Sequence, residues 1–112
     1  MIFVTGPLFA GKRDYIRQAL GLSPEAFARQ AVWDVQLLAA RAPDLTALAE
    51  ELAAREIVIA TEVGGGVVPV DPAERAAREA AGRLACLLAE RADTVIRVCC
   101  GLPQALKGKL PC

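Results

Sequence analysis

Apolar residues along the chain fall into short continuous runs that alternate with stretches of helical periodicity. Three runs rich in β-branched residues predict strands buried on both faces, at residues 2–5, 57–61 and 94–99. A fourth run, 31–35, fits either a strand or a helix. Between the runs, apolar residues recur every three or four positions, which predicts helices with one buried face.

Capping residues mark where the helices should begin. At Asp71 an N-cap side chain is followed by Pro72 at N1 and Glu74 at N3, so a helix is expected from there to about Arg91. Further helices are expected over 12–20, from Ser23-Pro24 and from Pro43-Asp44. The tail after Gly101 lacks any such pattern and is expected to be irregular.

Strands that alternate with helices need crossover connections, so the sheet should be parallel. We therefore expect an α/β fold with a small parallel sheet of about four strands and helices on both faces. With 112 residues, the chain 1–112 is long enough for one compact domain and too short for two.

The first predicted strand leads into a glycine-bounded loop that fits G-x-x-x-x-G-K, a phosphate-binding pattern. In this strand–loop–helix context, backbone N–H groups and the helix N-terminus converge on an anion. The fold expected is thus a single P-loop NTPase-like nucleotide-binding domain, with Lys12 holding the terminal phosphates. The expected nucleotide-binding residues of the loop are Gly6, Pro7, Leu8, Phe9, Ala10, Gly11, Lys12 and Arg13. An ordinary strand–helix turn with one exposed lysine is the alternative.

Arg13 departs from the motif, whose next residue should be a Ser or Thr that ligates Mg²⁺. A guanidinium cannot ligate a cation, although it suits phosphate geometry. We expect Mg²⁺ with ATP or GTP as the cofactor, with a Mg²⁺ dependence weakened by Arg13.

A second constellation carries a family resemblance. Residues 61–69 read Thr-Glu-Val-Gly-Gly-Gly-Val-Val-Pro and resemble the T-x-E-V-G-x-G-x-V-P signature of the adenosylcobinamide kinase / adenosylcobinamide-phosphate guanylyltransferase family. The following residues stand at the spacing of that family's R-x-F-R-D-x-x-G-R helix: Arg75, Arg78, Glu79, Gly82 and Arg83. The resemblance covers residues 1–15 and 57–107.

The resemblance implies a role in cobalamin biosynthesis, as a nucleotide-dependent kinase acting on adenosylcobinamide. It implies that Lys12 and Glu62 are catalytic, that Gly64 and Gly66 lie beside the nucleotide, and that Asp34 and Glu62 hold the metal through water. It also implies that three arginines contact substrate or a neighbouring subunit: Arg75, Arg78 and Arg83. Without the resemblance, Glu62 would be interpreted as a solvated strand-end carboxylate and the arginines as a solvated helix face.

Two departures limit the inherited activity. Family members form a guanylylated histidine, but this chain contains no histidine, so guanylyltransferase activity is not expected of it. Compared with the family, the chain also lacks a long segment between the helix that follows the phosphate motif and Asp44. The alternative function is therefore a non-catalytic nucleotide- or corrinoid-binding relative that partners a complete enzyme.

Composition and charge bear on the partners and the location of the protein. Thirteen basic and thirteen acidic residues give a formal net charge of +0, which argues against nucleic acid as a partner. No apolar run is long enough for membrane insertion and no signal peptide is visible, so a cytoplasmic location is expected. The four cysteines are expected to be small buried hydrophobes. The expected partners are the nucleotide, the corrinoid substrate and further copies of the chain in a homo-oligomer.

Overall fold

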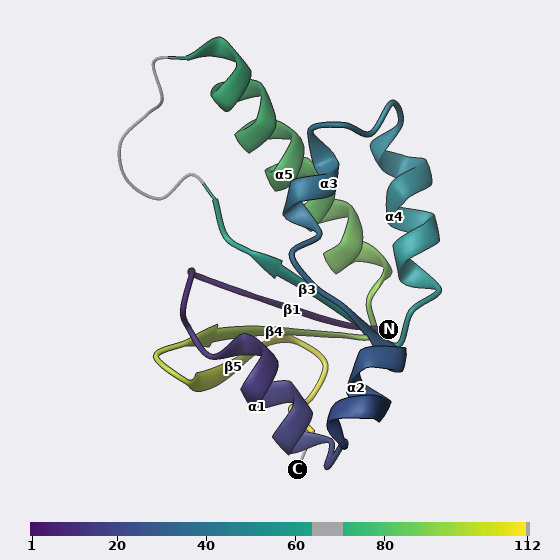
Figure 1. The fold of residues 1–112 in the computed structure, drawn as a ribbon, viewed down its shortest axis with the longest axis vertical. Coiled ribbons are helices and arrows are strands. Elements are labelled where there is room, and N and C mark those ends of the chain that lie inside the picture. Colours follow the sequence, from purple (N-terminus) through teal and green to yellow (C-terminus); the bar gives the residue numbers. More distant parts are fainter. Residues whose placement is uncertain (64–70, 112) are drawn as a thin grey trace.

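A computed structural model describes residues 1–63 and 71–111 (Figure 1). Gly64 and Gly66, predicted to lie beside the nucleotide, fall outside the described residues. The elements in chain order are β1 (Ile2–Gly6), α1 (Lys12–Ala19), α2 (Pro24–Gln30), β2 (Ala31–Val32), α3 (Gln36–Ala39), α4 (Leu45–Ala53), β3 (Ile57–Thr61), α5 (Pro72–Arg91), β4 (Thr94–Cys99) and β5 (Leu102–Lys107).

The strands form one sheet in the order β2-β3-β1-β4-β5. β1 pairs in parallel with β3 on one side and with β4 on the other, as the sequence predicted. Val4, for example, lies opposite Ile59 on one neighbour and opposite Ile96 on the other. The carboxyl ends of these strands therefore meet at one edge of the sheet, where open α/β sheets place their ligands.

Helices cover both faces of the sheet, so the predicted α/β class is confirmed (Figure 1). Because side chains alternate along a strand, Phe3 and Val58 face α3, α4 and α5, whereas Val4 and Ile59 face α1 and α2. On the face covered by α3, α4 and α5, the buried residues are largely alanine and leucine. These compact side chains let the long helix α5 pack closely on α3 and α4.

The predicted helix starts are confirmed by their caps. The Asp71 carboxylate accepts a hydrogen bond from the Ala73 N–H at 3.0 Å, and α5 ends at Arg91 as expected. The Asp44 carboxylate likewise accepts from the N–H of Thr46 at 3.0 Å, and the Ser23 hydroxyl caps α2.

Two features of the fold differ from expectation. The tail forms β5, which pairs antiparallel with β4 across a two-residue turn, so in the described residues the sheet has five strands instead of about four and is mixed instead of wholly parallel. Cys100 and Gly101 in that turn have φ values of 54° and 74°, as tight hairpins require, but a Cys-Gly pair is not a usual hairpin sequence. The predicted 31–35 segment is a strand for two residues only, and the short α3 follows it.

The expectation of buried cysteines is wrong for the three that the structure describes. Cys86, Cys99 and Cys100 are exposed free thiols. Cys86 lies on the outer side of α5, and Cys99 and Cys100 lie where β4 runs out into solvent. Their apolar character did not bury them because the strand ends at this edge, beyond the helices that cover its middle.

Gly6 should be the least replaceable glycine among the described residues. A Cβ at this position would lie 2.1 Å from the Val98 carbonyl oxygen, a backbone atom that cannot move aside without breaking β4. We expect Gly6→Ala to destabilise the fold by about 3 kcal/mol or more in urea denaturation. Gly82→Ala is the control, because open space surrounds Gly82 within α5. That substitution should stabilise the chain by about 0.5–1 kcal/mol. Equal effects would contradict the close approach.

Candidate functional site

The loop between β1 and α1 is fixed to the sheet at both ends. The Gly6 carbonyl accepts a hydrogen bond from the Glu62 N–H at 2.8 Å, which extends the β1–β3 pairing by one residue. The Ala10 carbonyl accepts another from the Gly101 N–H at 2.8 Å, so the loop rests on the β4–β5 turn. Phe9 and Gly11, with φ values of 60° and 84°, turn the chain back into α1. The loop is therefore a defined structure and not a slack connection.

Lys12 begins α1 and is only 8% exposed. Its ammonium donates a hydrogen bond to the Pro7 carbonyl at 2.7 Å, so the side chain folds back over the loop. Burial lowers the pKa of Lys12, while the carboxylates of Asp34 and Glu62 act in the opposite direction and favour the charged form. A partly desolvated cation thus stands at the carboxyl edge of the sheet.

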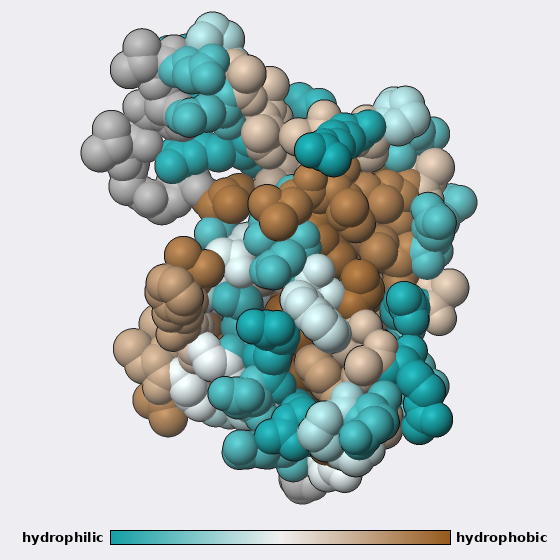
Figure 2. Space-filling model, in the orientation of Figure 1, coloured by the Kyte–Doolittle hydropathy of each residue, from teal (hydrophilic) through white to brown (hydrophobic). Residues whose placement is uncertain are grey.

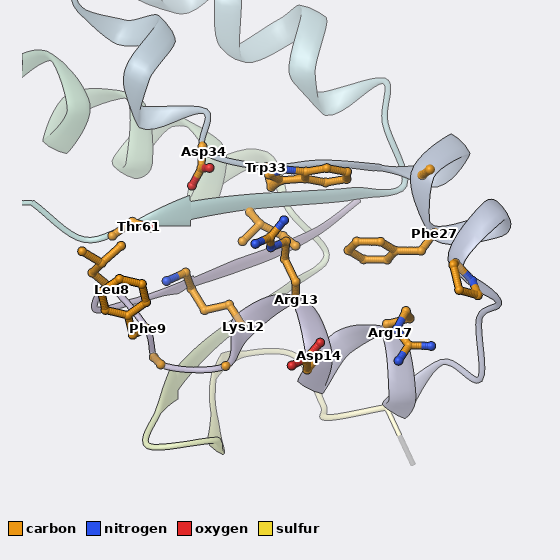
Figure 3. A pocket seen from close by; sticks show the side chains of 15 residues that line it. Leu8, Phe9, Lys12, Arg13, Asp14, Arg17, Phe27, Trp33, Asp34 and Thr61 are labelled. Carbon is orange, nitrogen blue, oxygen red and sulfur yellow. The ribbon is translucent and has the colours of Figure 1, made fainter.

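A pocket of about 830 Å³ opens between the loop with α1 and the segment from α2 to Asp34 (Figure 3). Its volume is typical of small-molecule sites. The pocket is lined by residues of the loop, α1, α2, the segment after β2, and β3: Leu8, Phe9, Ala10, Gly11, Lys12, Arg13, Asp14, Arg17, Pro24, Phe27, Ala28, Trp33, Asp34, Ile59 and Thr61. In Figure 3 the Lys12 ammonium lies between Leu8 and Asp34.

Arg13 is held against an aromatic wall of this pocket. Its guanidinium lies over the Trp33 ring, 5.4 Å from the centroid, and the Trp33 ring stacks on Phe27 at 5.6 Å with an interplanar angle of 10°. The sequence placed Arg13 in the loop motif but did not reveal this partner. The guanidinium is thus a second cation near Lys12, oriented by a ring.

Asp34 supplies a carboxylate to the pocket. It follows β2 with a φ of 56°, a left-handed conformation that a non-glycine residue adopts only where the surroundings favour it. It is exposed, lines the pocket and acts electrostatically on Lys12. The structure therefore brings Lys12 and Asp34 together in one pocket.

Glu62 is occupied by a partner that the sequence did not predict. The Arg97 guanidinium donates two hydrogen bonds to its carboxylate oxygens, at 2.6 and 3.0 Å. This bidentate pairing lowers the pKa of Glu62. Glu62 does not line the Lys12 pocket; Thr61, the residue before it, does, because neighbouring residues of a strand face opposite ways. Among the described residues, no three metal-binding side chains gather at one point.

Comparison with known protein families shows to which family the chain belongs. Residues 22–106 match the family model described as cobinamide kinase / cobinamide phosphate guanyltransferase. The chain belongs to this family. The match begins after residues 6–12, so the prediction that this loop binds phosphate depends on the loop's own sequence motif and geometry. No curated protein matches the chain.

Family membership places the chain among kinase and guanylyltransferase proteins of cobalamin biosynthesis. The cobinamide kinase family model covers Asp34, Glu62 and the whole of α5. In the part of the chain that the structure describes, no helix is long and apolar enough to cross a membrane.

The three arginines predicted to contact substrate or a subunit lie apart from the pocket. Arg75 and Arg78 are on the first turns of α5, which project away from the sheet in Figure 1. Arg83 lines a separate shallow hollow between α5 and the start of α4, beside Asp44 and Glu79. None of the three lines the Lys12 pocket. Their predicted contacts stay predictions.

Several lining residues escaped sequence reasoning because they lie outside any motif. Phe27 comes from α2, Trp33 directly follows β2, and Thr61 was quoted only as part of a signature. One available signal was the position of Trp33, the chain's single tryptophan, directly before Asp34. The pairing of Arg97 with Glu62 could not be predicted from the sequence, because a single arginine in an apolar strand is equally compatible with a solvent-exposed side chain that has no partner.

The Glu62–Arg97 pair predicts a pH-dependent stability. The folded-state pKa of Glu62 lies below its ordinary value of 4.5, so the pair stabilises the fold above that pH and less as the pH falls through the folded value. In Arg97→Gln the Glu62 pKa should rise toward 4.5, as read from the carboxyl carbon by NMR titration. The difference in unfolding free energy from the unmodified chain should be greatest at neutral pH and should shrink below 4.5.

Arg91→Gln is the matched control, because Arg91 pairs with Glu50 at 3.5 Å, far from Glu62 in the sequence. It should leave the Glu62 titration unchanged. A Glu62 pKa that is the same in both variants would contradict the bidentate pairing.

Proposed function

We propose that the chain is a cobinamide kinase-type phosphotransferase. It binds ATP or GTP with the phosphates on the loop 6–12 and transfers the terminal phosphoryl group to the aminopropanol hydroxyl of adenosylcobinamide. The observation that carries the proposal is the partly buried Lys12 ammonium, placed at the start of α1 and within a pocket that also contains Asp34.

Phosphate binding follows from the local backbone. The first N–H groups of α1, including those of Arg13 and Asp14, have no acceptor within the helix, and the helix dipole adds positive potential there. Lys12 uses one of its three N–H donors on Pro7, which leaves two for phosphate oxygens. Arg13 adds a guanidinium at the same helix end, and its planar fork matches phosphate.

The transfer itself needs positioning and charge more than covalent chemistry. The acceptor hydroxyl oxygen bonds to the terminal phosphorus while the bond from that phosphorus to the bridging oxygen breaks, and the nucleoside diphosphate leaves. We assign the hydroxyl proton to the Asp34 carboxylate, which faces the pocket. Glu62 acts in this proposal as a positioning charge near Lys12, because Arg97 holds both of its oxygens.

The residues present fit Mg²⁺ held mainly by the nucleotide. Mg²⁺ commonly takes one or two carboxylates together with phosphate oxygens and waters, and Asp34 is the carboxylate placed for that role through water. When bound, the ion would neutralise charge between the terminal phosphates. Arg13 stands where a hydroxyl ligand is usual, so its fixed cation takes over part of that neutralisation.

Guanylyl transfer through histidine lies outside the proposal, since the chain has no imidazole to attack GTP. The second candidate function is a nucleotide- or corrinoid-binding relative that acts beside a complete enzyme. Arg13 favours it, because a guanidinium held on Trp33 binds phosphate without supplying a metal ligand.

Release of ADP or GDP in the presence of adenosylcobinamide tests the kinase and separates the two candidates. The unmodified chain should release ADP or GDP only when the acceptor is present. Lys12→Ala should weaken ATP or GTP binding at least roughly tenfold by calorimetry and abolish turnover. Lys109→Ala is the control, because Lys109 lies exposed beyond β5. Nucleotide binding without turnover would favour the non-catalytic relative, and equal affinities of the two variants would contradict the phosphate site.

The role of Arg13 predicts an unusual response to Mg²⁺. Nucleotide affinity of the unmodified chain should change little when Mg²⁺ is replaced by a chelator. Arg13→Ser restores a hydroxyl, so its affinity should depend more strongly on Mg²⁺, and turnover should rise. Calorimetry of both proteins with and without Mg²⁺ provides the measurement. Strong Mg²⁺ dependence in the unmodified chain would show that Arg13 does not replace the ion.

A further inference from the structure

Exposed apolar side chains occur on the loop that lines the Lys12 pocket and on the segments bonded to that loop. Leu8 and Phe9 project from the loop, Val63 follows β3 and Leu102 begins β5. Phe9 is 95% exposed, although exposure of its apolar ring to water is unfavourable. In Figure 2 apolar residues are visible along the side of the molecule that Figure 1 identifies as the carboxyl edge of the sheet.

Backbone contacts fix these residues next to one another. The Gly101 N–H to Ala10 carbonyl bond places the start of β5 beside the loop, and the Glu62 N–H to Gly6 carbonyl bond places Val63 at the other side of the loop. Phe9 has a φ of 60°, a conformation that is uncommon for an aromatic residue and is found preferentially at functional sites. The fold thus holds the Phe9 ring outward at some conformational cost.

Leu8 and Phe9 belong to the same pocket as the proposed phosphate and proton groups. Figure 3 places them on one side of the Lys12 ammonium, with Asp34 on the other. A group lying on Leu8 and Phe9 would therefore border the terminal phosphate.

We propose that Leu8 and Phe9 form the platform on which the corrin ring of the acceptor lies, with Val63 and Leu102 extending it. This inference rests on the proposed function, which makes a cobinamide the acceptor. The loop then has two roles: its backbone binds phosphate, and its outward side chains bind the molecule that receives it.

Size and charge favour the macrocycle as the occupant. The pocket of about 830 Å³ can hold the aminopropanol arm, but a broad corrin ring must lie across the rim. Leu8, Phe9, Val63 and Leu102 are apolar, and a corrin macrocycle presents a broad hydrocarbon periphery edged by neutral amides. The anionic nucleotide, in contrast, is matched by Lys12 and Arg13 inside the pocket.

Phe9→Asn tests the platform, because asparagine tolerates the left-handed backbone and so preserves the loop. Calorimetry with cobinamide should show affinity roughly tenfold weaker or more, as expected for loss of a buried phenyl ring, while affinity for ATP or GTP stays within about twofold. Phe9→Tyr should retain cobinamide binding. Leu106→Asn is the matched control: Leu106 is exposed on β5 and does not line the pocket, so both affinities should be unchanged.

The outcomes separate this inference from the proposed function. If the unmodified chain binds no cobinamide, the proposed function fails and the platform fails with it. If it binds cobinamide and Phe9→Asn binds equally well, only the platform is overturned. A parallel loss of nucleotide affinity would make Phe9 a support of the loop and would also overturn it. So would a change in oligomeric mass in Phe9→Asn, measured by sedimentation without ligand, since a second copy would then cover the ring.

Discussion

The contact between Gly6 and the backbone of Val98 is the constraint on which the site depends. β1 can leave the sheet and enter the loop at this point only because residue 6 has no side chain against the Val98 carbonyl. The Gly6 carbonyl also accepts a hydrogen bond from the Glu62 N–H, so the last residue of β1 is bonded to the segment after β3 and packs closely against β4. Everything beyond it, including Lys12 and the platform at Leu8 and Phe9, takes its position from this point.

The charged side chains at the carboxyl edge of the sheet differ in burial and in their partners. Lys12 pays a desolvation penalty and is supported by two carboxylates of different kinds. Asp34 is exposed and faces the pocket, whereas Glu62 is held by Arg97 and faces the other side of the sheet edge. In the proposed mechanism, Asp34 takes the acceptor proton or holds a hydrated ion, while Glu62 supplies a fixed charge. This division explains why two acids that look equivalent in the sequence have different chemical roles in the proposed mechanism.

Most of the fold could be predicted from local sequence patterns. The strands at 2–5, 57–61 and 94–99 and the cap at Asp71 were predictable because continuous apolar runs and capping side chains act within a few residues. The hairpin at Cys100-Gly101 was not, because the positive φ of Cys100 comes from its surroundings and not from residue preference. In the site, the phosphate motif located Lys12, but the partners of Arg13 and Glu62 depend on long-range packing. Trp33 lies just after β2 and Arg97 lies in β4, both distant in sequence from their partners, so no spacing rule predicts these contacts.

The central place of β1 also has a consequence for folding kinetics. Its two neighbours, β3 and β4, are supplied by distant parts of the chain, and parallel pairings of this kind must close long loops before they gain stability. The loop after β1 cannot reach its final shape until both neighbours and the β4–β5 turn are in place. The anion binding proposed for Lys12 would thus arise late, after β1 has paired with β3 and β4, and a partly folded chain would lack it.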